Sequence, residues 1–256
     1  MSSTGLTIFA LPGVPLVQPG DDLGSLITDG LGRIDEALRD GDIVVVAQKI
    51  VSKSEGRLVP LDDVTPSDEA VKLAAKADKD PRLMELVLQE STDVLRTIRG
   101  VVITAHKSGI VMANAGIDRS NISEGADGEI ALLLPEDSDA SARALRDALK
   151  QATGKDVGVV IADSVGRAWR YGTVGLSIGC AGIEPLWDQR GDTDMFGRVL
   201  EVTEVAIADQ VASAANLVMG EAGEGTPLAI VRGLDVPRND RPASVAVRAK
   251  NEDLFR

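Results

Sequence analysis

Apolar residues return at a helical spacing in part of the chain. From Leu23 to Leu38 they recur every three or four positions, which is the period of an amphipathic helix. The preceding Gly20-Asp21-Asp22 predicts a turn whose carboxylate caps that helix. Three further segments have helical composition or periodicity and are predicted as helices: 66–98 with a break near Asp80-Pro81, 139–151, and 208–219.

Short continuous apolar runs elsewhere predict buried strands. They are rich in β-branched residues and occupy 43–47, 130–134, 157–162 and 227–231. Two more runs, 101–104 and 110–112, are joined by a short loop and predict a hairpin. Strands and helices follow one another without a regular βαβ order, so the pattern favours an α+β fold with mixed or antiparallel sheets over a doubly wound fold.

The length of 256 residues is sufficient for a single domain over 1–256, with the polar stretch 235–256 expected as a loosely held tail. The net charge of −13 and the aromatic content of 2% argue against nucleic-acid and anionic-membrane partners. No run approaches 18 apolar residues, and the first residues lack the basic start of a signal peptide, so we expect a cytoplasmic protein. One cysteine, Cys180, and one histidine, His106, leave no pair for a disulfide or a two-histidine metal site.

The first candidate site follows the predicted strand 157–162. Asp163 and Ser164 would emerge from its end, and Arg167 and Arg170 would lie on the loop that follows. A carboxylate beside a hydroxyl suits magnesium or manganese, and arginines suit phosphate or carboxylate. The alternative is a turn in which Asp163 caps a helix and the arginines are surface groups.

The second and third candidates also follow predicted strands. Residues 114–121 include Asp118, which could share a cation with Asp163, and Asn121, which could contact a nucleotide; an ordinary Asx turn is the alternative. Residues 47–57 concentrate Lys49, Lys53 and Arg57 in an acidic protein, which favours phosphate, although an exposed basic loop has the same composition. The chain has no Walker-type glycine loop. His106 is expected to be an ordinary loop histidine, and Cys180 a packing residue.

These three stretches, together with 19–23 and 208–220, resemble one family, the coenzyme F420-0:L-glutamate ligases. The stretches occur in the family's order and extend from about residue 11 to 234. The resemblance implies an F420 ligase-like fold and a homodimer with its active-site groove near the subunit junction. It also implies GTP as co-substrate and Mg²⁺ or Mn²⁺ as cofactor, with K⁺ as an additional candidate.

Several residue roles follow from the resemblance. Asp118 and Asp163 would hold one divalent cation, with Ser164 and Gln210 at a second, although Gln210 stands where a glutamate is frequent. Arg167 and Arg170 would position anions at the catalytic centre. GTP would be contacted by residues from three parts of the chain: Val14, Pro15, Leu16, Val17, Gln48, Lys53 and Asn121.

The implied reaction joins L-glutamate to the phospholactyl carboxylate of F420-0 in an amide bond, through an acyl phosphate made with GTP. Further γ-glutamyl additions are compatible with the same chemistry. Two alternatives stay open at this point. One is an amide ligase of this fold that acts on another phosphate-bearing acid. The other is a non-catalytic subunit that binds nucleotide or metal.

Overall fold

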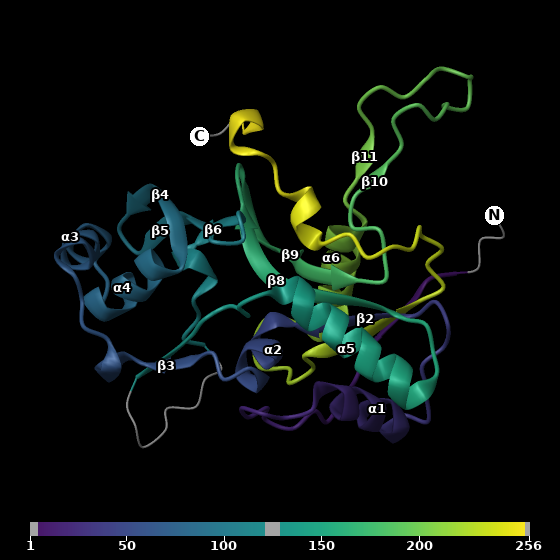
Figure 1. The fold of residues 1–256 in the computed structure, drawn as a ribbon, viewed down its shortest axis with the longest axis horizontal. Coiled ribbons are helices and arrows are strands. Elements are labelled where there is room, and N and C mark those ends of the chain that lie inside the picture. The colour runs from purple at the N-terminus through teal and green to yellow at the C-terminus, as the bar shows by residue number, and fades with distance from the viewer. Residues whose placement is uncertain (1–4, 121–128, 254–256) are drawn as a thin grey trace.

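The computed structural model describes residues 5–120 and 129–253, and its centre is a five-stranded mixed sheet (Figure 1). The strand order is β1-β12-β2-β8-β9. The strands are β1 (Thr7–Ala10), β12 (Leu228–Arg232), β2 (Ile43–Ala47), β8 (Gly158–Arg167) and β9 (Arg170–Ala181). β2 and β8 are parallel and the other neighbours are antiparallel, which confirms the predicted mixed sheet.

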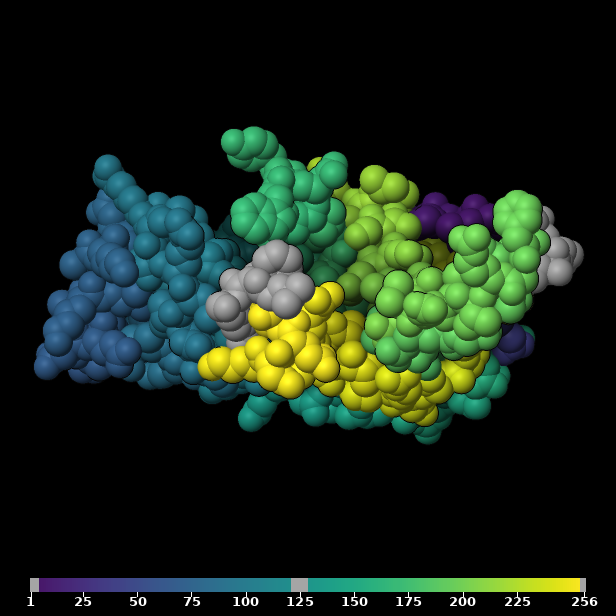
Figure 2. All heavy atoms as spheres, turned by 90° about the horizontal axis from the view of Figure 1, so that it is seen from above, coloured from purple at the N-terminus to yellow at the C-terminus, as the bar shows by residue number. Residues whose placement is uncertain are grey.

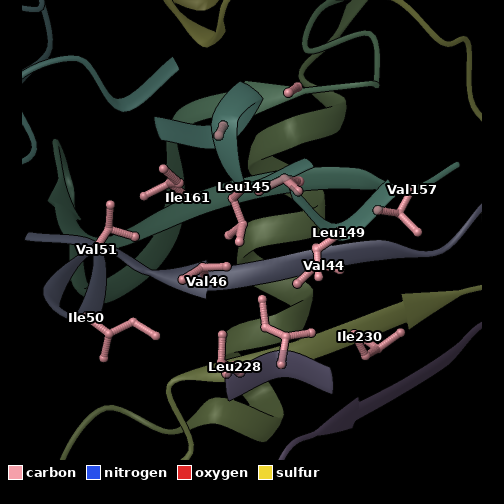
Figure 3. Packing of buried hydrophobic residues seen from close by; sticks show 14 of the residues in the cluster. Val44, Val46, Ile50, Val51, Leu145, Leu149, Val157, Ile161, Leu228 and Ile230 are labelled. Atoms are coloured by element: carbon pink, nitrogen blue, oxygen red, sulfur yellow. The ribbon is translucent and has the colours of Figure 1, made fainter. Parts of the chain in front are cut away.

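Helices cover both faces of this sheet because its central strands are apolar on both sides. On one face, Val44, Val46 and Ile161 pack with Leu145 and Leu149 (Figure 3). This face is covered by α1 (Leu23–Arg33) and α5 (Ser138–Thr153). The other face packs against α6 (Ile207–Met219). α5 and α6 fall where the sequence predicted them, and the Asp22 carboxylate caps α1 as expected, but α1 ends at Arg33 and not at Leu38, where the periodic segment ends.

A second layer of structure lies beside the sheet, at the left of Figure 1. It contains the three-stranded sheet β4 (Ser91–Ile98), β5 (Val101–His106) and β6 (Val111–Ala113), packed on α3 (Asp68–Ala77) and α4 (Pro81–Gln89). The predicted hairpin is confirmed as β5 and β6. The prediction of helix through residue 98 is wrong after α4, because residues 91–98 pair with β5 as an edge strand.

Shorter elements connect these layers. β3 (Leu58–Pro60) pairs with β7 (Ile130–Leu132), and α2 (Gln48–Ser54) begins directly after β2. β10 (Trp187–Asp188) pairs with β11 (Glu204–Val205) at the base of an extended arm, 189–203. Four 3₁₀ turns complete the described chain: η1 (Leu61–Asp63), η2 (Asn114–Gly116), η3 (Ala243–Ala246) and η4 (Lys250–Glu252).

Two segments differ from their predicted character. The strand predicted to end at residue 162 continues to Arg167, and β9 starts at Arg170, so the expected arginine-bearing loop is the tight end of a long hairpin. The segment expected to be a loose tail packs against α6 and the sheet through Val236 and Ala243, both buried. In the described part of the chain, no helix combines the length and the apolar character needed to cross a membrane.

Candidate functional site

The parallel pair β2 and β8 brings two parts of the chain to one sheet edge. Ala47 and Ala162, the last apolar residues of the two runs, are partners in register. Lys49 and Asp163 follow them, so a cation and a carboxylate emerge next to each other at the carboxyl ends of parallel strands, where open sheets present ligand-binding groups.

Asp118 reaches the same edge from the second layer. A tight turn at η2 precedes it, in which Gly116 has a φ of +70° and lies so close to Leu134 that a Cβ there would come within 2.8 Å of that side chain. Asp118 then exchanges two backbone hydrogen bonds with Leu132, of 3.0 and 2.9 Å. These backbone bonds fix the position of the carboxylate.

Lys49 and Asp118 form an ion pair, with 2.7 Å between Nζ and Oδ2. The Lys49 ammonium also donates to Ser120 Oγ at 2.9 Å, and the Ser120 N–H donates to Asp118 Oδ1 at 2.6 Å. Burial favours a raised pKa for Asp118, but the hydrogen bonds from Lys49 and Ser120 outweigh it and hold the pKa below its usual value. Asp118 is therefore an ionised carboxylate.

Asp163 has the opposite character. Its side chain is half-buried, and this burial raises its pKa to about 6, assisted by the negative charges of Asp118 and Glu221. A backbone hydrogen bond from Ser164, 2.9 Å long, and the charge of Lys49 oppose the rise without cancelling it. The structure thus brings Asp118 and Asp163 within electrostatic reach of each other, with one lysine shared between them.

Asn216 of α6 and Glu221, which follows the helix, also reach this edge, although the sequence analysis gave neither residue a role. The Asn216 amide donates to Ser164 Oγ at 3.2 Å and to Glu221 Oε1 at 3.0 Å. Gln210, in contrast, is exposed and lies six residues before Asn216, about 9 Å along the helix axis. The only sequence signal for Glu221 was an acidic residue directly after the Gly220 that ends the helix.

The two arginines predicted for this site lie away from it. Arg167 is four strand residues beyond Asp163, about 13 Å, and its guanidinium donates to the Gly172 carbonyl at 3.0 Å. Arg170 is exposed at the start of β9. Because β8 continues instead of forming a loop, the structure carries both arginines outward with the hairpin and separates them from the carboxylates.

The structure describes the positions of most, but not all, of the residues predicted to contact GTP. Lys53 is half-buried one turn after Lys49, and burial together with the charge of Lys49 lowers its pKa. Gln48 is buried, and its Oε1 accepts from Ser52 Oγ at 3.0 Å, so its side chain is directed into the protein. Asn121 lies outside the described residues.

The segment 14–17 is an extended stretch before α1, in which Leu16 is 81% exposed and Val17 is buried. A few residues later, the Gly20 N–H donates to the Ser54 carbonyl at 2.8 Å. This contact places the chain that follows 14–17 against the end of α2. The segment and Lys53 are therefore attached to the same short helix.

The described residues contain no group of three or more Asp, Glu, His or Cys side chains close enough to form a metal site by themselves. A divalent cation nevertheless fits the pair Asp118 and Asp163. Their negative charges raise the cost of ionising Asp163, and a hard cation with oxygen ligands offsets such a cost. The remaining ligands would come from outside the carboxylates, as phosphate oxygens can supply.

Comparisons with known proteins identify the relatives of the chain. A family model described as F420-0:Gamma-glutamyl ligase matches residues 13–233. A protein of Methanothermobacter thermautotrophicus named Coenzyme F420:L-glutamate ligase is 42% identical over 254 residues, covering 98% of this chain and 99% of its own. Proteins of the same name from Methanocaldococcus jannaschii, 46% identical over 86% of both chains, and Methanopyrus kandleri, 44% identical over 98% of this chain and 99% of its own, also match.

Proposed function

The chain belongs to the F420-0:gamma-glutamyl ligase family, and on that premise we propose that it joins L-glutamate to the phospholactyl carboxylate of coenzyme F420-0 with GTP as co-substrate. The observation that carries the proposal is the set Lys49, Asp118 and Asp163, brought together at one sheet edge inside a chain related to these ligases over nearly its full length. The arrangement supports chemistry on an anionic, phosphate-bearing ligand.

The reaction has two steps. A carboxylate is a poor acyl donor, so a carboxylate oxygen of F420-0 first attacks the γ-phosphorus of GTP, and GDP leaves with the electrons of the broken P–O bond. The acyl phosphate that results is then attacked by the amine of glutamate. The amide C–N bond forms, inorganic phosphate leaves with the electrons of the C–O bond, and the amine gives up a proton.

The residues of the site have distinct parts in this scheme. Lys53 supplies a positive charge for the phosphates of GTP, and its partial burial excludes water and so strengthens the attraction between that charge and the phosphates. Lys49 keeps Asp118 ionised. Asp118 and Asp163 would hold a divalent cation, which when bound would offset the negative charge of the phosphate oxygens.

A second cation position is better supported at Ser164 and Glu221 than at Gln210. Asn216 bridges the Ser164 hydroxyl and the Glu221 carboxylate, and Glu221 acts electrostatically on Asp163. A carboxylate also binds a hard cation more strongly than an amide oxygen. The exposed position of Gln210 favours a role on the surface.

Two protruding segments with exposed apolar side chains support the proposal of a homodimer. The tip of the β8–β9 hairpin exposes Trp169 and Tyr171, and the arm 189–203 exposes Met195, Phe196 and Val202, each of them more than four-fifths exposed. Figure 1 shows the arm extending from the body of the molecule, and Figure 2 shows the hairpin tip protruding from it. Large apolar side chains on protruding segments are typical of surfaces that a partner covers, and a second copy of this chain is the partner that we propose.

The test of this function is product analysis by mass spectrometry. Purified protein is incubated with F420-0, L-glutamate, Mg²⁺ and either GTP or ATP. The expected product is F420-0 plus one or more glutamyl units, formed with GTP at a rate more than about tenfold that with ATP. The preference follows because each guanine group left unpaired costs roughly 1–3 kcal/mol. Absence of a glutamylated product under all these conditions would contradict the proposal.

A further inference from the structure

A separate cavity of about 600 Å³ lies between the two layers of the protein. Its walls come from the β5–β6 turn, the start of α5, Ile178 of β9 and the η3 segment. The volume is within the range of small-molecule sites, which is roughly 300–1,000 Å³. None of Lys49, Asp118 and Asp163 is in its lining, so the cavity is an addition to the site described above.

One wall of the cavity is a buried polar cluster around Glu90. The Glu90 carboxylate is 3.2 Å from the Arg57 guanidinium and 3.1 Å from the Lys107 ammonium. His106 is 5% exposed, and its Nε2 has no hydrogen-bond partner among the described residues, the nearest Glu90 oxygen being 3.6 Å away. Two cations share one carboxylate here, so the wall carries excess positive charge.

The opposite wall is the beginning of α5. Gly179 of β9 lets this helix start directly on the sheet, because a Cβ at that position would collide with the Ser138 carbonyl. The Ala140 and Ser141 N–H groups are bonded to Asp137, which leaves the first N–H groups of the helix, those of Ser138 and Asp139 in the cavity lining, without an intrahelical partner. Such N–H groups favour a negatively charged ligand.

Two charged side chains of the lining are uncommitted. Arg143, one turn into α5, makes no hydrogen bond or ion pair with the described residues, and neither does Glu136 before the helix. The acidic neighbours Asp137 and Asp139 differ, since both accept backbone N–H groups: Asp137 from Ala140, and Asp139 from Cys180 and Ala243. The cavity lining therefore contains one cationic side chain, Arg143, and one anionic side chain, Glu136, that have no partner among the described residues, beside the positively charged wall around Glu90.

We propose that this cavity binds the amino-acid substrate, an acidic α-amino acid, through Arg143, the first N–H groups of α5, Lys107 and Glu136. An acidic amino acid carries two carboxylates and one ammonium. Arg143 and the helix start match one carboxylate, Lys107 matches the second, and Glu136 matches the ammonium. The inference rests on the proposed function, in which that amino acid is L-glutamate.

The position of the cavity agrees with this assignment. Leu134 lines the cavity and lies two residues after Leu132, whose backbone is bonded to Asp118. Two extended residues span about 7 Å. The cavity is also larger than one amino acid requires, and the excess leaves space for the carboxyl end of the second substrate, which the amine must meet.

The test compares steady-state kinetics of Arg143→Gln, Glu136→Gln and the matched control Arg146→Gln. Arg146 lies on the same helix one turn further, pairs with Asp240 and lines a different cavity. We expect Arg143→Gln to raise the KM for L-glutamate at least about tenfold, Glu136→Gln to raise it about threefold, and both to leave the KM for GTP unchanged. Arg143→Lys should recover part of the affinity, and the control should behave like wild type.

An unchanged KM for L-glutamate in folded Arg143→Gln would overturn the assignment, as would an equal rise in the KM of all three substrates. A failure of the proposed function looks different. In that case the wild-type protein itself forms no glutamylated product, whereas an active wild type with an indifferent Arg143→Gln contradicts the cavity assignment alone.

Discussion

Two half-buried carboxylates of this protein, Glu90 and Asp163, lie in opposite electrostatic surroundings. The imidazole of His106 and the cations Lys107 and Arg57 bring the pKa of Glu90 down to about 2. Asp163 has one backbone hydrogen bond from Ser164 and a share of the Lys49 charge, and burial with the nearby charges of Asp118 and Glu221 still raises its pKa to about 6. The surroundings of Glu90 stabilise its ionised form, whereas ionisation of Asp163 lowers the stability of the fold. A carboxylate kept in that state is characteristic of a functional site.

The activity of Asp163→Asn is the strongest test of the contrast between Asp163 and Glu90. If Asp163 helps to hold the cation that offsets phosphate charge, this variant should lose ligation by on the order of 10³-fold or more. Initial rates of glutamylated product, measured by mass spectrometry in parallel with the wild type, check this. Normal turnover in a folded Asp163→Asn would remove Asp163 from the chemistry.

Glu90→Gln should act on stability instead. The substitution leaves Arg57 and Lys107 without their carboxylate in a site where Glu90 is only 12% exposed. We expect the free energy of unfolding to fall by about 2–3 kcal/mol. Chemical denaturation measures it, with Glu69→Gln, an exposed residue of the neighbouring helix α3, as the control. A Glu90→Gln protein as stable as wild type would show that the cluster contributes nothing to the fold.

The pH dependence of stability in the metal-free protein sharpens the contrast, because the pKa of Asp163 is raised by folding and that of Glu90 is lowered. The folded-state pKa of Asp163 is raised, so its ionisation destabilises the fold as pH rises from about 4 to 6. Asp163→Asn should therefore be more stable than wild type above pH 6, by about 1–2 kcal/mol after allowance for partial exposure, and the gap should close below pH 4.

Glu90 behaves in the reverse manner. Its folded-state pKa is depressed, so its contribution is complete above pH 4.5 and is lost as the pH falls toward 2. The difference in stability between wild type and Glu90→Gln should shrink over that interval. Equal slopes for the two variants across pH 3–7 would contradict the assignment of opposite roles.

The smallest effect is expected from Lys53→Ala. Lys53 lies one turn from Lys49 and is proposed to meet the phosphates of GTP, so its removal should raise the KM for GTP about threefold to tenfold with the fold intact. Lys79→Ala, on the loop between α3 and α4, is a control for loss of one positive charge. Unchanged GTP kinetics in Lys53→Ala would make Lys53 an ordinary surface lysine.

Three strands of the main sheet, β2, β8 and β12, and its covering helices were predictable because each carries its own signal, whereas β1 and β9 were not predicted. The run 43–47 and the periodic segment 139–151 both reach the core where their patterns indicated. Residues 91–98 were not predictable in the same way, since their strand state comes from pairing with β5. Pairing partners are a property of the tertiary structure and leave no periodicity in a half-exposed edge strand.

The site was predictable to a similar degree. Lys49 and Asp163 each follow a buried apolar run, so each could be singled out as a candidate, but their meeting depends on the parallel pairing of β2 with β8, which only the structure gives. Glu221 could not, because it lies on a loop whose course depends on how α6 packs. The location of the hairpin arginines was missed for a related reason: apolar character ends at Ala162, but β8 continues to Arg167 through its pairing with β9.

The central claim is that the negative charge of Asp163, unlike that of Glu90, is not offset by neighbouring cationic side chains, and that a bound divalent cation offsets it. Titration of Mn²⁺ in the presence of GDP, followed by the electron paramagnetic resonance signal of free Mn²⁺, tests it without requiring turnover. Wild type and Glu90→Gln should bind Mn²⁺ with similar affinity, and Asp163→Asn should bind it at least about tenfold more weakly. Equal affinity in the wild type and Asp163→Asn would contradict the claim.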